Sequence, residues 1–467
     1  MRIDENIKRN GYFWLPGKPD RKIPGILLIT DGGNISLEIL DMFDNSPKGL
    51  KDALSGGNED IDRINGFVEE SGYVTLDDCF YTKRNISFGS ISKSIICINK
   101  ALFGVAFEKD EELLFNSFLF SVEGIDDWIG ISGIKVDHDI ENKSAKIEYK
   151  PPQEISISLN NGMILQITFM WKLPGFPSNK EAIISQKVYF KLISDIKLRL
   201  GDFISVSHKI TALLGFAIDK TVSIEKVSAN SNSLKRKMGD DKYFPIQIKV
   251  YYSSILYLSE IPKISVHDML FRYIHIQNDF ENKVNNWLIA YDHINPTLSL
   301  YFSTKIGAQR HVDGKIIALV QALESYHRRT ETEKIIPEDE YKILVNTLLN
   351  SCPDHRKEWL TSRLAYGNEM SLRNRLKNII EPFKDIIGTN KERRKLISNI
   401  VNTRNYLTHY DQSLEDFALN GLELWQLSIK IEAIIQLHLL IILGFTMEEI
   451  QSVYNNSYML KEKLKST

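Results

Sequence analysis

Apolar and polar residues alternate through much of the first half of the chain, with the two-residue period of β-strands. Residues 26–30 and 35–40 are two such segments on either side of Asp31-Gly32-Gly33-Asn34, which predicts a β-hairpin. Asn160-Asn161-Gly162 predicts a second tight turn. We expect further strands at residues 73–76, 94–98, 146–149, 155–159, 163–171, 186–192 and 246–252. One wetted face is typical of antiparallel sheets, so we predict a sandwich or a barrel.

The apolar spacing lengthens toward the 3.6-residue period of a helix at residues 204–216 and, throughout, after Pro262. Residues 228–242 form a polar, basic stretch that predicts a loop. The helices that we expect after Pro262 cover residues 266–291, 314–329, 337–350, 355–365, 371–383, 390–409 and 414–445, with a short one after Met447. The fold class predicted is therefore α+β, with a β-rich N-terminal domain followed by an all-α helical bundle.

The change of period near Pro262 predicts two domains, residues 1–262 and 263–467, with the helical core at about 310–467. The boundary is defined to within about ten residues. Residues 266–300 are either a connector or the first helical layer of the second domain. A chain of 467 residues exceeds what one hydrophobic core usually serves, which agrees with this division.

The composition limits the cellular environment and the binding partners that we expect for this protein. The net charge of -2 argues against a protein that coats nucleic acid along its whole surface. Three separated cysteines suggest neither a disulfide framework nor a zinc site, and they fit a reducing cytoplasm. The polar N-terminus lacks a signal-peptide pattern. The apolar stretch at residues 431–445 is shorter than the roughly twenty residues that span a bilayer, so we predict a buried helix and no membrane partner.

One stretch of the predicted helix at residues 390–409 stands out chemically. It contains Arg404, Asn405 and His409, which are a permanent cation, an amide and a group that titrates near neutral pH. Asn405 and His409 are four residues apart and share one helix face, while Arg404 lies on its flank. An arginine five residues before a histidine is common by chance, and the asparagine directly after the arginine makes the pattern more specific. One surface can therefore present all three groups to a phosphate.

The segment Arg404-Asn405-Tyr406-Leu407-Thr408-His409 resembles the RNxxxH motif of HEPN domains, which are small helical bundles found in many prokaryotic ribonucleases of toxin and defence systems. Gly11-Tyr12-Phe13-Trp14-Leu15-Pro16-Gly17, with Pro24-Gly25 and Leu37-Glu38-Ile39, is similar to the opening of the ApeA-type N-terminal domain. Residues 319–328 resemble the first helix of the HEPN domain paired with it. The chain thus resembles the ApeA-like antiphage HEPN proteins at both ends.

That resemblance implies a metal-independent endoribonuclease that acts by abortive infection on transfer RNA or other structured RNA, with a phage component as the trigger. RNA cleavage needs a base for the 2′-hydroxyl proton, an acid for the leaving 5′-oxygen and a cation for the developing charge. We expect His409 to be the acid or base, Arg404 the stabilising cation and Asn405 the group that orients them. Because one chain supplies one such histidine, the resemblance implies a composite site in a homodimer or a higher homo-oligomer.

Supporting groups are predicted around this motif. Glu324 and Arg328 match an E-x-x-x-[KR] feature of some HEPN domains, but they also fit a plain ion pair one helical turn apart. Tyr410 directly follows the motif. Residues 353–411 contain twelve Lys and Arg against seven acidic residues, which predicts a local RNA track or only a solvated helix face. The candidates for that track are Arg373, Arg375, Lys377, Arg393 and Arg394.

No Walker, GxSxG or HExxH pattern occurs, and the histidines and cysteines lack metal-ligand spacing, so we predict neither a metal site nor a cofactor. Three alternatives remain open. Arg404 could pair with a neighbouring helix while His409 caps a helix end. The bundle could be a non-catalytic HEPN scaffold or an RNA-binding dimerisation module behind a ligand-sensing β-domain. The β-domain could instead bind a carbohydrate or a peptide, with the bundle serving only to dimerise it.

Overall fold

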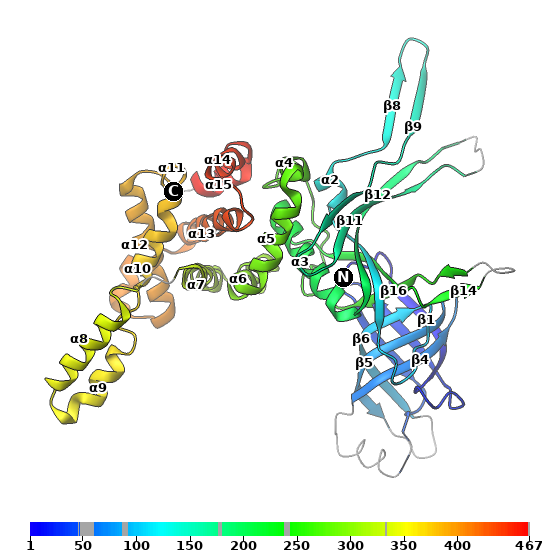
Figure 1. Cartoon of the computed structure of the whole chain (residues 1–467), viewed down its shortest axis with the longest axis horizontal. Coiled ribbons are helices and arrows are strands. Elements are labelled where there is room, and N and C mark those ends of the chain that lie inside the picture. Colours follow the sequence, from blue (N-terminus) through cyan, green and yellow to red (C-terminus); the bar gives the residue numbers. More distant parts are fainter. Residues whose placement is uncertain are drawn as a thin grey trace. The chain divides into compact units, whose positions relative to one another are not determined.

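Six strands at the start of the chain close into a barrel in the computed structural model, which describes residues 1–44, 46, 60–85, 92–175, 180–237, 243–331 and 334–465 (Figure 1). Around the barrel the strand order is β6-β3-β2-β1-β4-β5, and β5 pairs again with β6. The strands are β1 (Ile7–Trp14), β2 (Ile23–Thr30), β3 (Asn34–Ile39), β4 (Asp60–Val68), β5 (Gly72–Asn85) and β6 (Lys93–Phe103). Each of these strand pairs is antiparallel. Because β5 pairs with β6, the six strands close into a barrel, and the barrel alternative of our prediction is confirmed.

Apolar residues that alternate with more exposed ones along these strands fill the interior of the barrel. Leu27 and Ile29 on β2 and Ile35, Leu37 and Ile39 on β3 all point into one buried cluster, whereas the residues between them are partly exposed. A one-residue shift of register would turn this set outward, so the burial fixes the register of the predicted hairpin.

The sheet continues beyond β6 in the order β16-β13-β7-β12-β11-β10. These strands are β7 (Leu114–Val122), β10 (Ile155–Ser158), β11 (Ile164–Lys172), β12 (Ser185–Arg199), β13 (Ile224–Asn230) and β16 (Ile248–Tyr252). Helix α3 (Leu200–Ile218) packs on β7 and β12, where Phe203 stacks on Phe118 with ring centroids 5.9 Å apart. Smaller elements of this part are α2 (Ile125–Ile129), the pair β8 (Ile134–Asp139) and β9 (Ser144–Tyr149), and the pair β14 (Lys235–Lys237) and β15 (Tyr243–Pro245).

The chain divides into two compact units, Met1–Leu288 and Ile289–Thr467, and the division falls within α5 (Phe280–His293). Two short helices, α4 (Tyr273–Ile276) and η1 (Gln277–Asp279), precede α5. All regular secondary structure among the described residues of the second unit is helical, which confirms the α+β class. The domain boundary proposed near Pro262 stays a prediction.

Helix α7 lies at the centre of the second unit and packs against α6, α10, α12 and α13. The helices are α6 (Asn295–Lys305), α7 (Val312–Thr330), α8 (Glu338–Asn350), α9 (Asp354–Leu364), α10 (Leu372–Ile380), η2 (Glu381–Phe383), α11 (Lys384–Ile387), α12 (Asn390–His409), η3 (Gln412–Phe417), α13 (Gly421–Ile442), α14 (Met447–Asn456) and α15 (Tyr458–Lys465). Helices α8 and α9 pack on each other and stand out from the bundle (Figure 1).

By length and composition α13 is apolar enough to cross a membrane, but 67% of its most apolar window is buried inside the structure. It carries Glu432, whose carboxylate accepts hydrogen bonds from Lys305 at 2.8 Å, Lys463 at 2.9 Å and Lys315 at 3.1 Å. Burial opposes ionisation of Glu432, but the three ammonium groups outweigh it and hold its pKa well below the usual value. The helix is therefore bonded to α6, α7 and α15 at a charged point in the core.

Several predicted elements differ from those in the structure. One helix over residues 414–445 is wrong, because η3 ends at Phe417 and α13 starts only at Gly421. The loop at residues 228–242 is wrong in part, because β13 reaches Asn230 and β14 follows, while residues 238–242 lie outside the described residues. Strand β7 was not predicted, since Asn116 and Ser117 stand side by side among its apolar residues and break the alternation.

Candidate active site on helix α12

The predicted motif lies in the last turns of α12, a helix with clear ends. Thr389 accepts a hydrogen bond from the backbone N–H of Glu392, and the Glu392 carboxylate accepts the Thr389 N–H at 2.6 Å, which makes a capping box. The face packed on the bundle carries Leu396, Ile397, Ile400, Thr403 and Leu407. Arg404, Asn405 and His409 lie outside that buried set, so all three are half-buried or exposed.

Arg404 is held at two points. Its Nη1 donates to Asn405 Oδ1 at 3.2 Å, and its Nη2 lies 3.7 Å from Glu324 Oε2 on α7. The side chain of Arg404 remains 32% exposed. A guanidinium has five N–H donors, so these contacts orient the group and leave donors for a phosphate.

His409 is the last residue of α12, and its side chain is exposed. Asn405 precedes it by one turn, on the same helix face. Tyr410 then ends the helix in the left-handed conformation, with φ of 50°, and is 64% exposed. Hydrogen bonds from Ser413, with a smaller contribution from His409, lower the pKa of Asp411. Acid–base and cationic groups thus share one accessible helix end.

Glu324 and Arg328 on α7 meet this end of α12 directly. Glu324 lies between two arginines, since Arg328 Nη2 donates to its Oε1 at 3.4 Å and Arg404 approaches its Oε2. The pair is therefore more than an ion pair along one helix, because it joins α7 to the candidate catalytic arginine.

The predicted basic residues occupy different environments. Arg373, Lys377 and Arg394 are exposed, and Arg373 also donates to Ser398 Oγ at 3.0 Å. Arg393 is half-buried and donates to the carbonyl of Gly388 at 2.7 Å, beside the end of α11. The exposed three are the ones positioned to meet a polyanion.

Arg375 differs from the other four. It is 5% exposed, and it donates to His327 Nδ1 at 3.1 Å and to the Met370 carbonyl at 3.1 Å. Its Nη2 also lies 3.3 Å from Glu369 Oε2. Because its donors are used inside the bundle, we exclude Arg375 from the proposed RNA surface.

Sequence inspection missed Glu369, which pairs with Arg328 at 2.5 Å and so extends the set of charges around Arg404. Nothing in the local sequence marks it, because its partners Arg328 and Lys334 lie far before it in the chain and Arg375 follows it on α10. Within the described ranges, no cluster of three or more His, Cys, Asp or Glu that could hold a metal ion occurs.

Large apolar side chains are exposed directly after the motif. They are Tyr410 at 64%, Phe417 at 62%, Leu422 at 68% and Trp425 at 49% exposure. Four such residues within one short segment are unusual for a surface that meets only water. This segment, residues 410–425, is called the apolar rim below.

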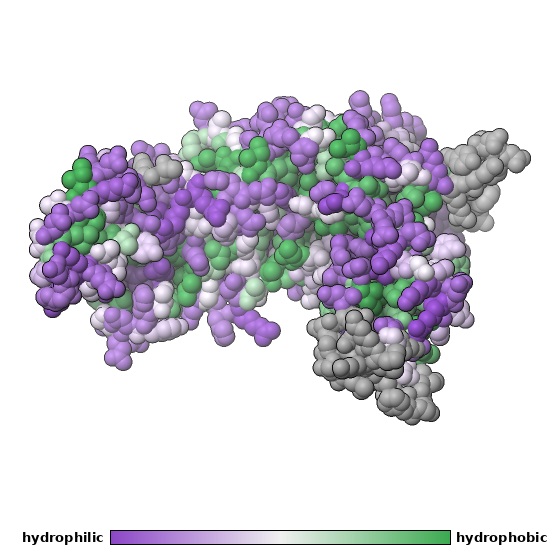
Figure 2. Space-filling view, turned by 60° about the horizontal axis from the view of Figure 1, so that its bottom comes forward, coloured by the Kyte–Doolittle hydropathy of each residue, from purple (hydrophilic) through white to green (hydrophobic). Residues whose placement is uncertain are grey.

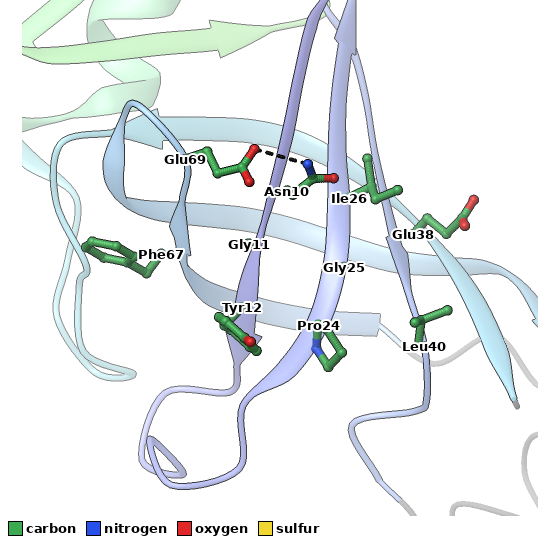
Figure 3. Close-up of a pocket in the computed structure, with 10 residues that line it drawn as sticks. All are labelled: Asn10, Gly11, Tyr12, Pro24, Gly25, Ile26, Glu38, Leu40, Phe67 and Glu69. Atoms are coloured by element: carbon green, nitrogen blue, oxygen red, sulfur yellow. Dashed lines mark hydrogen bonds between the residues drawn. The ribbon is translucent and has the colours of Figure 1, made fainter.

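The first unit has a groove of about 530 Å³ on the outer wall of the barrel (Figure 3). Tyr12 on β1 and Phe67 on β4 stand at its walls and are 57% and 52% exposed. Gly25 lies in its middle, where an added Cβ would meet the Glu38 carbonyl at 2.5 Å, so a glycine is required. The charged groups that line the groove are Glu38, which is paired with Lys93 at 2.6 Å, and Glu69, so the groove suits a ligand with apolar groups and a cation near Glu69 and disfavours RNA phosphate.

Two family models match the chain in the order that the sequence suggested. The model for ApeA N-terminal domain 1 matches residues 8–287, which is more than half of the chain, and the Apea-like HEPN model matches residues 317–449. Comparison with curated proteins and with solved structures gave no significant match. The second matched segment contains Glu324, Arg404 and His409, and HEPN domains are generally ribonucleases that bind RNA and often dimerise. The chain belongs to the ApeA family of antiphage HEPN effectors.

Proposed function

We propose that this protein is a cytoplasmic, metal-independent endoribonuclease that cleaves transfer RNA or other structured RNA and so stops phage growth by abortive infection. The observation that carries the proposal is the geometry at the end of α12. Asn405 and Glu324 hold the half-exposed Arg404, and the exposed His409 lies on the same helix. These are the groups that transfer of an RNA phosphate needs.

In the proposed reaction the ribose 2′-oxygen attacks phosphorus, forming the O2′–P bond as the P–O5′ bond breaks. One His409 takes the 2′-hydroxyl proton, and a second His409 gives a proton to the leaving 5′-oxygen. Arg404 stabilises the extra negative charge on the phosphorane-like transition state through its remaining N–H donors. The products are a 2′,3′-cyclic phosphate and a 5′-hydroxyl.

Two histidines require two copies of the chain. We propose an isologous homodimer, or a higher oligomer built from it, in which two α12 ends face each other. The apolar rim supports this arrangement, because its aromatic and aliphatic side chains directly follow the motif and are the kind that anchor interfaces. Burying this segment against its copy would bring the two motifs to one cleft.

Arg373, Lys377 and Arg394 are proposed to guide the RNA backbone toward that cleft. They are exposed on α10 and α12, and α12 also carries the motif. Each phosphate contact of this kind adds a salt-sensitive contribution to RNA affinity.

The alternative is a non-catalytic HEPN scaffold or RNA-binding dimer behind a ligand-sensing β-domain. The groove on the barrel favours the sensing part of this alternative, since Tyr12 and Phe67 offer exposed apolar anchors beside two carboxylates. A phage protein segment with apolar and basic side chains is the trigger that this groove would suit. Sensing and cleavage are compatible, so the two proposals differ only in whether α12 performs chemistry.

The test is cleavage of total transfer RNA by the purified protein in the presence of a chelator, with analysis of both RNA ends. We expect cyclic phosphate and 5′-hydroxyl ends from the unmodified protein and none from His409→Ala. The matched control is His355→Ala, because His355 is another exposed histidine of the same unit, on α9. Phage protection that survives in both Arg404→Ala and His409→Ala would establish the scaffold alternative instead.

A further inference from the structure

A chain of ion pairs leads from Arg404 to a part of the molecule that the proposed chemistry does not use. Arg404 lies 3.7 Å from Glu324, Glu324 lies 3.4 Å from Arg328, and Arg328 Nη1 lies 2.5 Å from Glu369 Oε2. The first pair joins α12 to α7, and the last joins α7 to the segment just before α10. Charges of opposite sign alternate along the whole series.

Glu369 lies at the base of the arm, the name used here for residues 337–367 with helices α8 and α9. The neighbouring Asn368 closes that base, accepting the Ile336 N–H at 3.0 Å and donating to the Ile336 carbonyl at 2.9 Å. The backbone N–H of Ile335 also donates to the Asn368 carbonyl. The position of Glu369 is therefore tied to the root of the arm.

The arm has no buried residue in either helix. The apolar side chains of Ile343 and Trp359 are 67% and 56% exposed. Figure 2 shows hydrophobic and hydrophilic surface intermixed at its left end. Within the arm, Tyr341 donates to the Leu364 carbonyl at 2.5 Å and joins the two helices. The arm is thus internally bonded, and its firmest attachment to the bundle is its base.

A second arginine fixes the same carboxylate from the core side. Arg375 Nη2 lies 3.3 Å from Glu369 Oε2, and Arg375 is held by the buried His327. Desolvation and the nearby Arg328 lower the pKa of Arg375, so the Glu369 Oε2 charge compensates these two arginines, while Lys334 lies 4.0 Å from Oε1. Removing that charge frees Arg328 to turn both of its donor edges to Glu324.

A bidentate contact between Arg328 and Glu324 would compete with the longer contact between Glu324 and Arg404. Of its two contacts within the described residues, Arg404 would then keep the hydrogen bond to Asn405, and its guanidinium would sample more orientations. Loss of orientation at a transition-state donor lowers the rate of the chemical step more than it lowers substrate binding.

We propose that Glu369, at the root of the arm, is a positioning residue that holds Arg404 in its catalytic orientation through Arg328 and Glu324. The inference rests on the proposed ribonuclease function and adds a residue that the motif does not contain. It also connects the root of the arm to the candidate catalytic arginine through a series of ion pairs.

The first experiment compares RNA cleavage by Glu369→Gln and by Glu358→Gln, the latter an exposed glutamate on α9 of the same arm. We expect Glu369→Gln to lower kcat about tenfold with KM within about twofold. Glu369→Asp should restore part of the loss, and Glu358→Gln should match the unmodified protein. Equal kcat values for Glu369→Gln and Glu358→Gln would overturn the proposal.

A double-mutant cycle tests whether Glu369 acts on Arg404 through Arg328, which we call the relay, or only through a general loss of stability. Arg328→Gln breaks the same series in its middle, so it should also lower kcat, and adding Glu369→Gln to it should change kcat by less than about twofold. Multiplicative effects of the two substitutions would show that Glu369 does not act through Arg328. Thermal unfolding of every variant identifies any that fails to fold, and Arg328→Gln then tests the relay alone.

A readout without RNA keeps the inference separate from the proposed function. The Arg404 Nε–H signal in an NMR spectrum is assigned by its absence in Arg404→Lys. We expect Glu369→Gln to shift this signal and Glu358→Gln to leave it in place. An unchanged signal in both variants overturns the relay, whereas a shifted signal with no RNA cleavage by the unmodified protein overturns only the ribonuclease function.

Discussion

Two carboxylates of the helical unit, Glu432 and Glu324, each meet several cations, yet they lie in opposite environments. The Glu432 side chain is 5% exposed and is held by three lysines, two of which are themselves nearly buried. The Glu324 side chain is 22% exposed and meets two arginines that remain 32% and 47% exposed. One cluster is closed to solvent and the other is open.

This difference in exposure leads us to expect different roles for the two clusters. Lysines that converge on one buried carboxylate use their charge inside the core, and breaking such a group leaves buried cations uncompensated. Arginines around a half-exposed carboxylate keep N–H donors for another ligand. We therefore expect substitutions at Glu432 to act on stability and substitutions around Glu324 to act on cleavage.

The largest expected effect is on chemistry. Arg404→Ala and His409→Ala should each lower the rate of RNA cleavage by roughly 10²- to 10⁴-fold, because each removes a group that we propose acts on the reacting phosphate. Their free energies of unfolding should stay within about 0.5 kcal/mol of the unmodified protein, since both side chains are at least partly exposed. Steady-state cleavage and chemical denaturation measure the two quantities, and a stability loss that accounts for the lost activity would remove the distinction between the clusters.

The next largest effect is on stability. Glu432→Gln should lower the free energy of unfolding of the helical unit by roughly 3–5 kcal/mol, because Lys305, Lys315 and Lys463 lose their counter-charge. The melting temperature should fall on the order of 10 °C. Scanning calorimetry measures it, with Glu423→Gln on the exposed first turn of α13 as the control. A fully stable Glu432→Gln would show that solvent, and not the carboxylate, neutralises the lysines.

The pH dependence of stability tests another buried titratable group of the helical unit, His438. Burial, with a contribution from His327, lowers the pKa of His438 from 6.5 to about 4. The unfolded chain thus binds a proton at a pH where the folded chain does not, so stability is present above pH 6.5 and is lost as the pH falls toward 4.

His438→Gln should abolish this loss, which amounts to about 3 kcal/mol, because glutamine keeps an N–H for the Ile379 carbonyl and does not titrate in this range. Denaturation of both proteins at several pH values measures it. The gap between them should narrow on acidification, and a gap that is independent of pH would contradict the assigned burial of His438.

The smallest expected effect concerns the apolar rim. Trp425→Ser should weaken the proposed dimer by about 1–2 kcal/mol, or roughly five- to thirtyfold in the dissociation constant. The control is Trp359→Ser, since Trp359 is 56% exposed on the arm and Trp425 is 49% exposed beside the motif. Sedimentation at several concentrations measures both variants, and equal effects would remove the rim from the interface.

Much of this architecture follows from local sequence patterns. Alternation and tight turns predicted the barrel hairpin at Asp31-Gly32-Gly33-Asn34, and helical spacing placed α12 at its observed limits. The spacing of Asn405 and His409 was enough to place them on one face. Strand β7 was missed because Asn116 and Ser117 stand side by side and interrupt its alternation, and η3 was missed although Asn420-Gly421, a typical turn signal, separates it from α13.

The site could be predicted only where its residues share one helix. The contact between Glu324 and Arg404 depends on the packing of α7 against α12, and that of Glu369 depends on the closed root of the arm. Arg375 shows the reverse case, because its sequence environment is that of a surface cation while tertiary packing buries it. Contacts between distant segments carry no local sequence signal.

If each chain carries half of a ribonuclease site, as we propose, mixing active and inactive subunits should reveal it. Unmodified and His409→Ala chains are coexpressed in varied ratios, and the initial rate of RNA cleavage is measured against the unmodified fraction. We expect the rate to follow the square of this fraction, so that equal amounts give about a quarter of the full rate. A linear dependence would show that one chain suffices, and a rate that does not depend on the mixture would exclude His409 from the chemistry.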